Sequence, residues 1–293
     1  DLLGLPMLKK QVIDRPYWVT ETLWVNPHEY QNEAALLTAI YNGVTGVGAT
    51  FFAGPRNVTW AGDIYYRFIP DTGQGHPMMK WNCSEPGHMG SFPAAALLQR
   101  LGCIPAPTPA LVERRTFDDM AALTLPMIAE GGEYDPNRYA GGKLAGGVAG
   151  VVPPQMFLVG PVYVSHSTAA VSYVAPRALV AATNRPIAGA NGVVAADPAH
   201  GLVTLDAPGA HAVIGFLKSA GPIRLSAMTL VCDAVHAGVA VVALDGLPLT
   251  TSTNILVQLA PRVRPTDWRV EPVAATPSGE QRWRIAATGR TPF

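Results

Sequence analysis

The chain has 293 residues, of which 48% are hydrophobic and 14% are charged, with 21 basic and 21 acidic side chains. This length suits one large domain or two ordinary ones, and the hydrophobic content is enough for real cores. Because the net charge is zero and no basic stripe is present, we expect no nucleic-acid partner. No run of about 18 apolar residues occurs, so we expect no membrane partner either.

Three cysteines, Cys83, Cys103 and Cys232, are too few and too scattered for a disulfide framework or a zinc site. Three buried thiols are the main expectation, and a single Cys83–Cys103 bridge is the open alternative. His76 and His88 alone, without convergent ligands, do not indicate a metal site. The sequence therefore predicts no metal and no cofactor.

The first predicted elements are a helix over residues 2–13 and a strand over 17–20, rich in aromatic and β-branched residues. Apolar side chains on both faces are typical of a buried parallel strand. Glu21 follows at the predicted end of this strand, between Trp18 and Trp24. In parallel α/β folds the carboxyl ends of the strands carry the active site, so Glu21 is the first candidate for chemistry.

A helix is predicted over 29–41 and a second buried strand over 47–53, bounded by glycines. A long loop, 54–87, follows; such loops inside compact domains are usually functional. A helix over 92–101 then ends at Gly102.

The Pro-rich connector 104–109 marks a domain boundary, so we expect the parts 1–105, 106–150 and 151–293. The middle part is a linker and surface excursion, with a short helix within 111–127. Regularly spaced short strands in the last part predict an antiparallel β-sandwich. The predicted strands are 157–164, 178–182, 202–206, 212–217, 228–232, 237–244, 255–259, 268–272 and 281–286.

Residues 12–105 resemble the last quarter of a (β/α)8 glycoside hydrolase of the retaining, clan A type. The match places Thr20-Glu21 at the end of the seventh strand, 30–40 in the seventh helix, 46–54 in the eighth strand and 90–101 in the closing helix. The resemblance implies an α/β part, the C-terminal portion of a TIM (β/α)8 barrel, followed by an all-β part.

The second half resembles the C-terminal β-sandwich of such enzymes. Residues 205–208, Leu-Asp-Ala-Pro, precede Gly215-Phe216, as in one strand pair of that domain. Residues 244–249, Leu-Asp-Gly-Leu-Pro-Leu, precede Ser252 and 255–257, Ile-Leu-Val, as in a later pair. Both resemblances occur in the expected order along the chain.

By this resemblance Glu21 is the nucleophile of a retaining mechanism, which needs a second carboxyl group about 5–5.5 Å away. The family takes that acid from the end of the fourth strand, which this chain does not contain. Among the carboxyl groups of this chain, Glu85 is the best remaining candidate for that acid. Two strands cannot close a barrel. We therefore expect a second polypeptide or a preceding N-terminal segment to supply the first six strands.

Aromatic rings that cover the apolar face of a sugar, and polar groups that bind its hydroxyls, are the expected substrate contacts. The candidate sugar platforms are Trp24, Trp60 and Trp81, and the candidate hydroxyl ligands are Asn26, His28 and His76.

The predicted function is hydrolysis of a polysaccharide or oligosaccharide by a secreted or periplasmic bacterial glycosidase. The alternative is a non-catalytic carbohydrate-binding or assembly subunit with the same aromatic loops. A third possibility is a structural β-sandwich protein. A second carboxyl group facing Glu21 separates the first hypothesis from the others.

Overall fold

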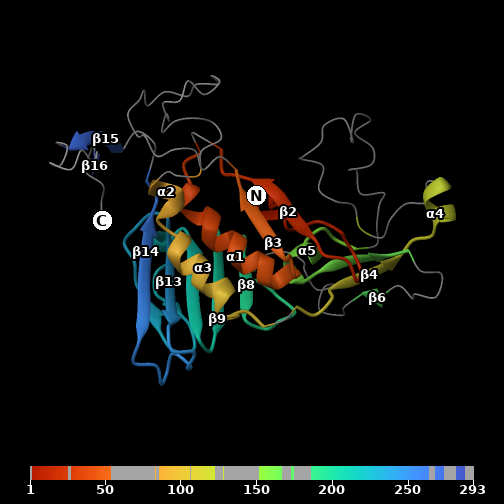
Figure 1. Ribbon diagram of the computed structural model, residues 1–293. Helices are drawn as coiled ribbons and strands as arrows, with labels where there is room; N and C mark the ends of the chain where they lie inside the picture. Colours follow the sequence, from red (N-terminus) through yellow and green to blue (C-terminus); the bar gives the residue numbers. More distant parts are fainter. Residues whose placement is uncertain are drawn as a thin grey trace. The chain divides into compact units, whose positions relative to one another are not determined.

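The protein was analysed as a computed structural model, shown in Figure 1. It describes residues 2–25, 28–53, 83, 86–105, 107–122, 128, 152–166, 173–174, 186–263, 268–273 and 282–287. The chain divides into two compact units, each made of three stretches. Unit 1 comprises Asp1–Val19, Thr38–Thr50 and Leu98–Ala207, and unit 2 comprises Thr20–Leu37, Phe51–Leu97 and Pro208–Phe293. The predicted division at 105 and 150 stays a prediction.

Two strands and the helices between them form a crossover near the N-terminus (Figure 1). The elements are β2 (Trp18–Thr22), the 3-10 helix η2 (Gln31–Glu33), α1 (Ala34–Thr45) and β3 (Ala49–Phe52). The Gly48 N–H donates to the Tyr17 carbonyl at 3.0 Å. Five residues further along both strands, the Ala53 N–H donates to the Thr22 carbonyl, so β2 and β3 run parallel.

The prediction that both of these strands are buried is wrong. In β2 only Val19 is buried, while Trp18 is 59% exposed, and in β3 Phe51 is 50% exposed. An apolar run shows that a strand can be buried on both faces, but burial also requires other layers to pack on those faces. Among the described residues this sheet has only the two strands β2 and β3. Glu21 is the fourth residue of β2 and exposed, rather than the residue that follows the strand.

The helix predicted over 2–13 is also wrong. The segment holds a short 3-10 helix, η1 (Leu2–Gly4), and a short strand, β1 (Gln11–Val12). β1 pairs in parallel with β5 (Val162–Ser165), and the buried Gln11 amide donates to the Thr45 carbonyl at 2.9 Å. Pairing with a strand about 150 residues away overrides the local helical periodicity.

The sheet of unit 1 has the order β1-β5-β4-β6, with β4 (Leu111–Arg114) parallel to β5 and β6 (Tyr173–Val174) antiparallel to β4. The short helix expected within 111–127 is α4 (Phe117–Ala121), which follows β4. The strand expected over 157–164 begins with one helical turn, α5 (Met156–Val159), before β5.

A six-stranded sheet has the order β14-β13-β10-β9-β8-β7. Its strands are β7 (Ile187–Ala188), β8 (Val194–Asp197), β9 (Leu202–Ala207), β10 (Ala210–Gly215), β13 (Ala237–Ala243) and β14 (Ile255–Pro261). The strands predicted at 202–206, 212–217, 237–244 and 255–259 are confirmed.

Two further pairs are antiparallel hairpins, β11 (Ile223–Arg224) with β12 (Thr229–Leu230), and β15 (Trp268–Val273) with β16 (Arg282–Ala287). These confirm the predictions near 228–232, 268–272 and 281–286. The strand predicted at 178–182 lies outside the described residues.

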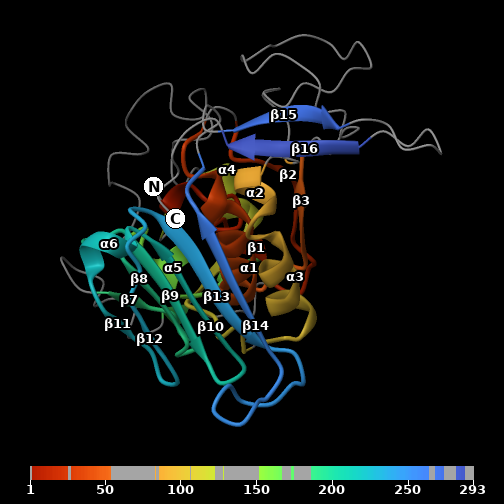
Figure 2. The ribbon, with the colours of Figure 1, turned by 90° about the vertical axis from the view of Figure 1, so that its left-hand side faces the viewer.

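Helical segments cover one face of β13 and β14 (Figure 2). Among them are α2 (Pro86–Met89) and α3 (Phe92–Arg100), which lie beside these strands. The Ala94 N–H donates to Gln258 at 2.8 Å, and the Gln258 amide donates to the Gly90 carbonyl. A Cβ atom on Gly238 would lie 2.9 Å from the Leu36 side chain, so the helix packs directly on the strand backbone. The β-sandwich stays a prediction.

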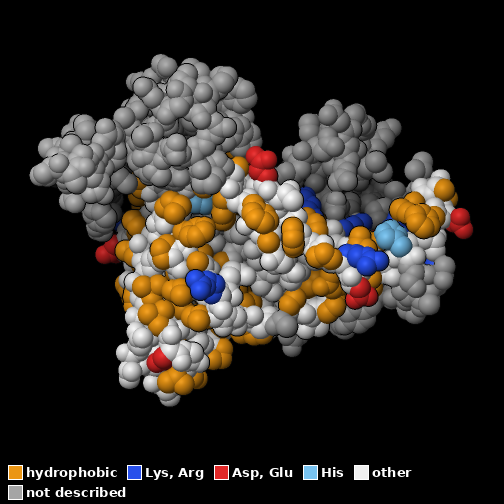
Figure 3. Space-filling model, viewed as in Figure 1, with side chains coloured by type: hydrophobic (Ala, Val, Ile, Leu, Met, Phe, Trp, Pro, Cys, Tyr) orange, Lys and Arg blue, Asp and Glu red, His pale blue; other side chains and the backbone are white. Residues whose placement is uncertain are grey.

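Apolar side chains also reach the surface on the face seen in Figure 3, as the 14% charged content leads us to expect. Among the large exposed ones, Ile255, Val257 and Leu259 alternate along β14 and are 40%, 69% and 50% exposed.

Candidate functional site

Two of the seven residues predicted from sequence to contact substrate or perform chemistry lie close to each other along one segment of unit 2. Glu21 is exposed in β2, and Trp24, half-buried, lies three residues later. His28 is the next described candidate; its Nδ1 accepts the Tyr30 N–H at 3.1 Å. Desolvation of the ring lowers the pKa of His28 below its usual value. The remaining candidates, Asn26, Trp60, His76 and Trp81, lie outside the described residues.

The Trp24 indole contacts a carboxylate that the sequence analysis did not assign to the site. Its Nε1–H donates to Oε1 of Glu33 at 3.0 Å. The other oxygen of Glu33, Oε2, lies 3.4 Å from Nε2 of His236. We call Trp24, Glu33 and His236 the Glu33 cluster. One carboxylate oxygen thus accepts the indole N–H, and the other lies within ion-pair distance of a ring nitrogen.

The neighbours of His236 assign the hydrogen to its Nε2 atom. The Asn32 amide nitrogen donates to the Ala260 carbonyl at 2.9 Å and lies 3.4 Å from Nδ1 of His236. Because an amide nitrogen can only donate, Nδ1 accepts. The hydrogen of this tautomer then lies on Nε2, the ring nitrogen 3.4 Å from Oε2 of Glu33. With 3% of its surface exposed, His236 is held in this orientation.

Aromatic rings surround His236 in unit 2. Its ring centroid lies 4.6 Å from that of Tyr30 and 5.1 Å from that of Phe216, the latter edge-on at 79°. The Arg262 guanidinium lies over the Tyr30 ring, 5.6 Å from its centroid, and binds the Glu29 carboxylate at 3.1 Å. His236 is therefore packed against two aromatic rings, and the nearby charges of Arg262 and Glu29 are paired.

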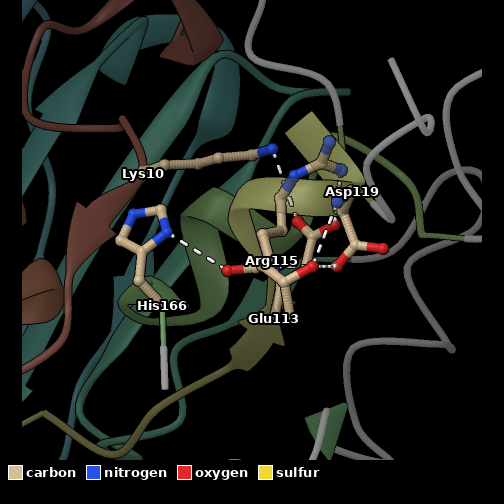
Figure 4. Close-up of polar contacts among 6 residues, drawn as sticks. Lys10, Glu113, Arg115, Asp119 and His166 are labelled. Carbon is tan, nitrogen blue, oxygen red and sulfur yellow. Dashed lines mark hydrogen bonds and ion pairs between the residues drawn. The ribbon is translucent and has the colours of Figure 1, made fainter. Parts of the chain in front are cut away.

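A second polar cluster lies in unit 1 and was also missed from sequence (Figure 4). Glu113, in β4, is 3% exposed and lies 3.5 Å from Lys10 Nζ and 3.4 Å from Arg115. The His166 ring, after β5, donates from Nδ1 to the Arg115 carbonyl at 3.2 Å. The charge of the buried Glu113 carboxylate is therefore compensated by two cations within unit 1.

The short helix α4 follows this cluster along the chain and is capped at its N-terminus. The Thr116 hydroxyl accepts the Asp119 N–H at 3.0 Å, and the Asp119 carboxylate accepts the Thr116 N–H at 2.8 Å. These two bonds form a capping box that starts α4. The Thr116 N–H and hydroxyl both donate to the Asp119 carboxylate, and these two bonds lower the pKa of Asp119. Phe117, which begins α4, is 76% exposed and its ring stacks on His166 with 6.2 Å between centroids.

No group of three or more potential metal ligands converges among the described residues. Cys83, Cys103 and Cys232 are free thiols, so the alternative of a Cys83–Cys103 bridge is wrong. Only Cys83 is buried and the other two are half-buried, because Cys103 follows the exposed end of α3 and Cys232 lies in an open connection. Within the described part of the chain, no helix is both long and apolar enough to cross a membrane.

Comparison with known proteins found no match: no protein-family model, no curated protein and no solved structure is significantly similar to this chain.

Proposed function

We propose that this chain contributes the nucleophile Glu21 and part of the sugar-binding surface of a retaining glycoside hydrolase that acts on a polysaccharide or oligosaccharide. The remaining barrel strands, and the second carboxyl group, come from a preceding segment or another polypeptide. No cofactor takes part in this proposal.

The observation that carries the proposal is the parallel crossover of β2, α1 and β3, with Glu21 on β2. Consecutive parallel strands joined by a helix are the repeating element of a (β/α)8 barrel. A further helix, α3, follows β3 along the chain, in the order that such a barrel end requires.

The exposure of the strand pair also supports a missing neighbour. Trp18 on β2 is 59% exposed and Phe51 on β3 is 50% exposed, although both are large apolar side chains. Because two parallel strands cannot close on themselves, additional strands would pair with them and cover these side chains.

In the proposed reaction the Glu21 carboxylate attacks the anomeric carbon while the second carboxylic acid gives its proton to the departing glycosidic oxygen. The bond to the leaving group breaks, and an ester joins the sugar to Glu21. Water then attacks the same carbon, giving its proton to the second carboxylate, and the ester oxygen leaves as the Glu21 carboxylate.

The test begins with native mass spectrometry of the purified protein, to find a tightly bound second polypeptide. The complex is then incubated with aryl 2-deoxy-2-fluoroglycosides, which react as substrates but hydrolyse slowly once esterified. We expect one sugar to be added to the peptide that contains Glu21, and Glu21→Gln to lose both labelling and turnover because an amide is a poor nucleophile.

Glu29→Gln is the matched control, since Glu29 is another exposed glutamate of unit 2. Turnover by Glu21→Gln at the level of the Glu29→Gln control would remove Glu21 from the mechanism. Saccharide binding without labelling or hydrolysis would favour the alternative, a non-catalytic carbohydrate-binding or assembly subunit.

A further inference from the structure

Trp24 is fixed at two points by the 3-10 helix η2. The buried Gln31 amide donates to the Trp24 carbonyl at 3.2 Å, which holds the backbone. The Glu33 carboxylate accepts the indole Nε1–H at 3.0 Å, which holds the ring. Because the N–H bond lies in the plane of the indole, this hydrogen bond sets the orientation of the ring without occupying either of its faces.

The Glu33 carboxylate is in turn held by His236, which joins it to the core of unit 2. His236 is 3% exposed, its Nε2 lies 3.4 Å from the Glu33 carboxylate, and its Nδ1 lies 3.4 Å from the Asn32 amide nitrogen. The Glu33 side chain keeps 23% of its surface exposed. The chain of contacts therefore runs from a buried imidazole, through a partly exposed carboxylate, to an aromatic ring three residues after Glu21.

We propose that Glu33 and His236 are positioning residues that orient the Trp24 indole as a stacking surface for a pyranose ring of the substrate. The proposal rests on the proposed function and extends it, because it names residues that act through Trp24 rather than on the reacting atoms. A ring locked before the sugar arrives loses little rotational freedom on binding, so its orientation contributes to affinity.

The probes are cellohexaose, xylohexaose and mannohexaose, titrated by calorimetry into the protein with any polypeptide that copurifies. We expect one of them to bind, Trp24→Ala to abolish that binding, and Glu33→Leu to weaken it about tenfold, the effect of one lost charge-assisted hydrogen bond. Glu33→Gln keeps an acceptor oxygen for the indole and is expected to bind within about threefold of the wild type. Asp233→Leu, an exposed acidic position of the same unit, is expected to bind normally.

A double-mutant cycle separates positioning from general stability. Trp24→Phe keeps an aromatic face but has no N–H, so adding Glu33→Leu to it should cause no further loss of affinity. The NMR resonance of the Trp24 indole N–H should lie further upfield in Glu33→Leu than in the wild type, because the N–H has lost its carboxylate acceptor. If Glu33→Leu fails to fold, Trp24→Phe alone tests the same hydrogen bond from the donor side, and we expect it to weaken binding about tenfold.

Wild-type affinity in Glu33→Leu, or an equal loss of affinity in the Trp24→Phe background, would overturn the positioning role. Failure of all three hexasaccharides to bind would overturn it as well. Binding is measured without turnover, so an inactive complex that still binds through Trp24 would contradict the proposed hydrolase and leave this inference intact.

Discussion

The imidazole of His88 lies edge-on against the ring of Phe52, with 4.5 Å between the ring centroids and 82° between the planes. His88 is 1% exposed, and neither of its ring nitrogens has a hydrogen-bond partner among the described residues. Burial lowers the pKa of His88 from 6.5 to about 4, because the charged imidazolium would lose its water without gaining a partner.

This burial predicts an acid-sensitive fold. Between pH 6.5 and 4 the unfolded chain binds a proton at His88 that the folded chain does not, so the free energy of unfolding falls as the pH falls through this range. The expected loss is about 3 kcal/mol, complete near pH 4 and absent above pH 6.5. Urea denaturation at pH 4.5 and 7.5 measures it.

His88→Leu should lose most of this pH dependence, because it leaves an apolar side chain against Phe52. His200→Gln, which replaces an exposed histidine, should keep the wild-type dependence. Equal pH profiles for wild type and His88→Leu would show that another group is responsible.

Glycine is required at position 160 by the backbone of the neighbouring connector. A Cβ atom there would lie 2.6 Å from the Thr108 carbonyl oxygen, and a backbone atom cannot turn aside as a flexible side chain would. Gly160→Ala should therefore lower the free energy of unfolding by about 2 kcal/mol, the usual cost of overpacking.

Gly209→Ala is the control, since its nearest contact would be 3.7 Å from the Leu247 carbonyl and therefore ordinary. The two variants are compared by urea denaturation. If they prove equally stable, the close approach at Gly160 is relaxed in solution.

Glu113 is the buried charge whose removal should be most costly in unit 1. Glu113→Gln leaves Lys10 and Arg115 without their shared carboxylate, and we expect a loss of about 2 kcal/mol in the free energy of unfolding. Lys10→Met should cost less than 1 kcal/mol, because Lys10 is the more exposed partner and Arg115 still pairs with Glu113. A larger effect from Lys10→Met than from Glu113→Gln would reverse this ranking.

The thiol of Cys103 should react slowly with iodoacetamide near neutral pH. Partial burial raises its pKa, so less of the nucleophilic thiolate is present at a given pH than for a free cysteine. Labelling is followed by peptide mass spectrometry between pH 7 and 10. The pH at which the labelling rate is half-maximal should be higher for the folded protein than for the same thiol in concentrated urea. Identical profiles in the two conditions would contradict the desolvation of this thiol.

Local pattern was sufficient to predict four strands of the six-stranded sheet, β9, β10, β13 and β14, and the helices α1 and α3, whereas the strands β7 and β8 were not predicted. β10 and β13 are apolar runs bounded by turns, and Gly102, with φ of 60°, ends α3 as expected. The same reasoning failed where a distant partner decides the structure. β1 is a strand because β5 lies beside it, and a helical pattern of leucines in the first 13 residues carries no information about β5.

The candidate site shows the same limit. Glu21 and Trp24 are three positions apart in the sequence, so their proximity could be predicted. Glu33 and His236 are 203 residues apart, and no spacing rule joins a residue of a 3-10 helix to the residue that precedes β13. A single sequence also could not show that Glu113 lies beside Lys10, because their contact depends on the parallel sheet of unit 1.

The interleaving of the two units has a consequence for synthesis of the chain. Each unit is assembled from three stretches, and unit 2 needs residues after Pro208 while its first stretch begins at Thr20. The early stretches therefore leave the ribosome long before their partners exist, and unit 2 can fold only after the residues beyond Pro208 have been synthesised. A cut within the Pro-rich connector would leave both units without one of their parts, so neither half of the chain should be stable alone.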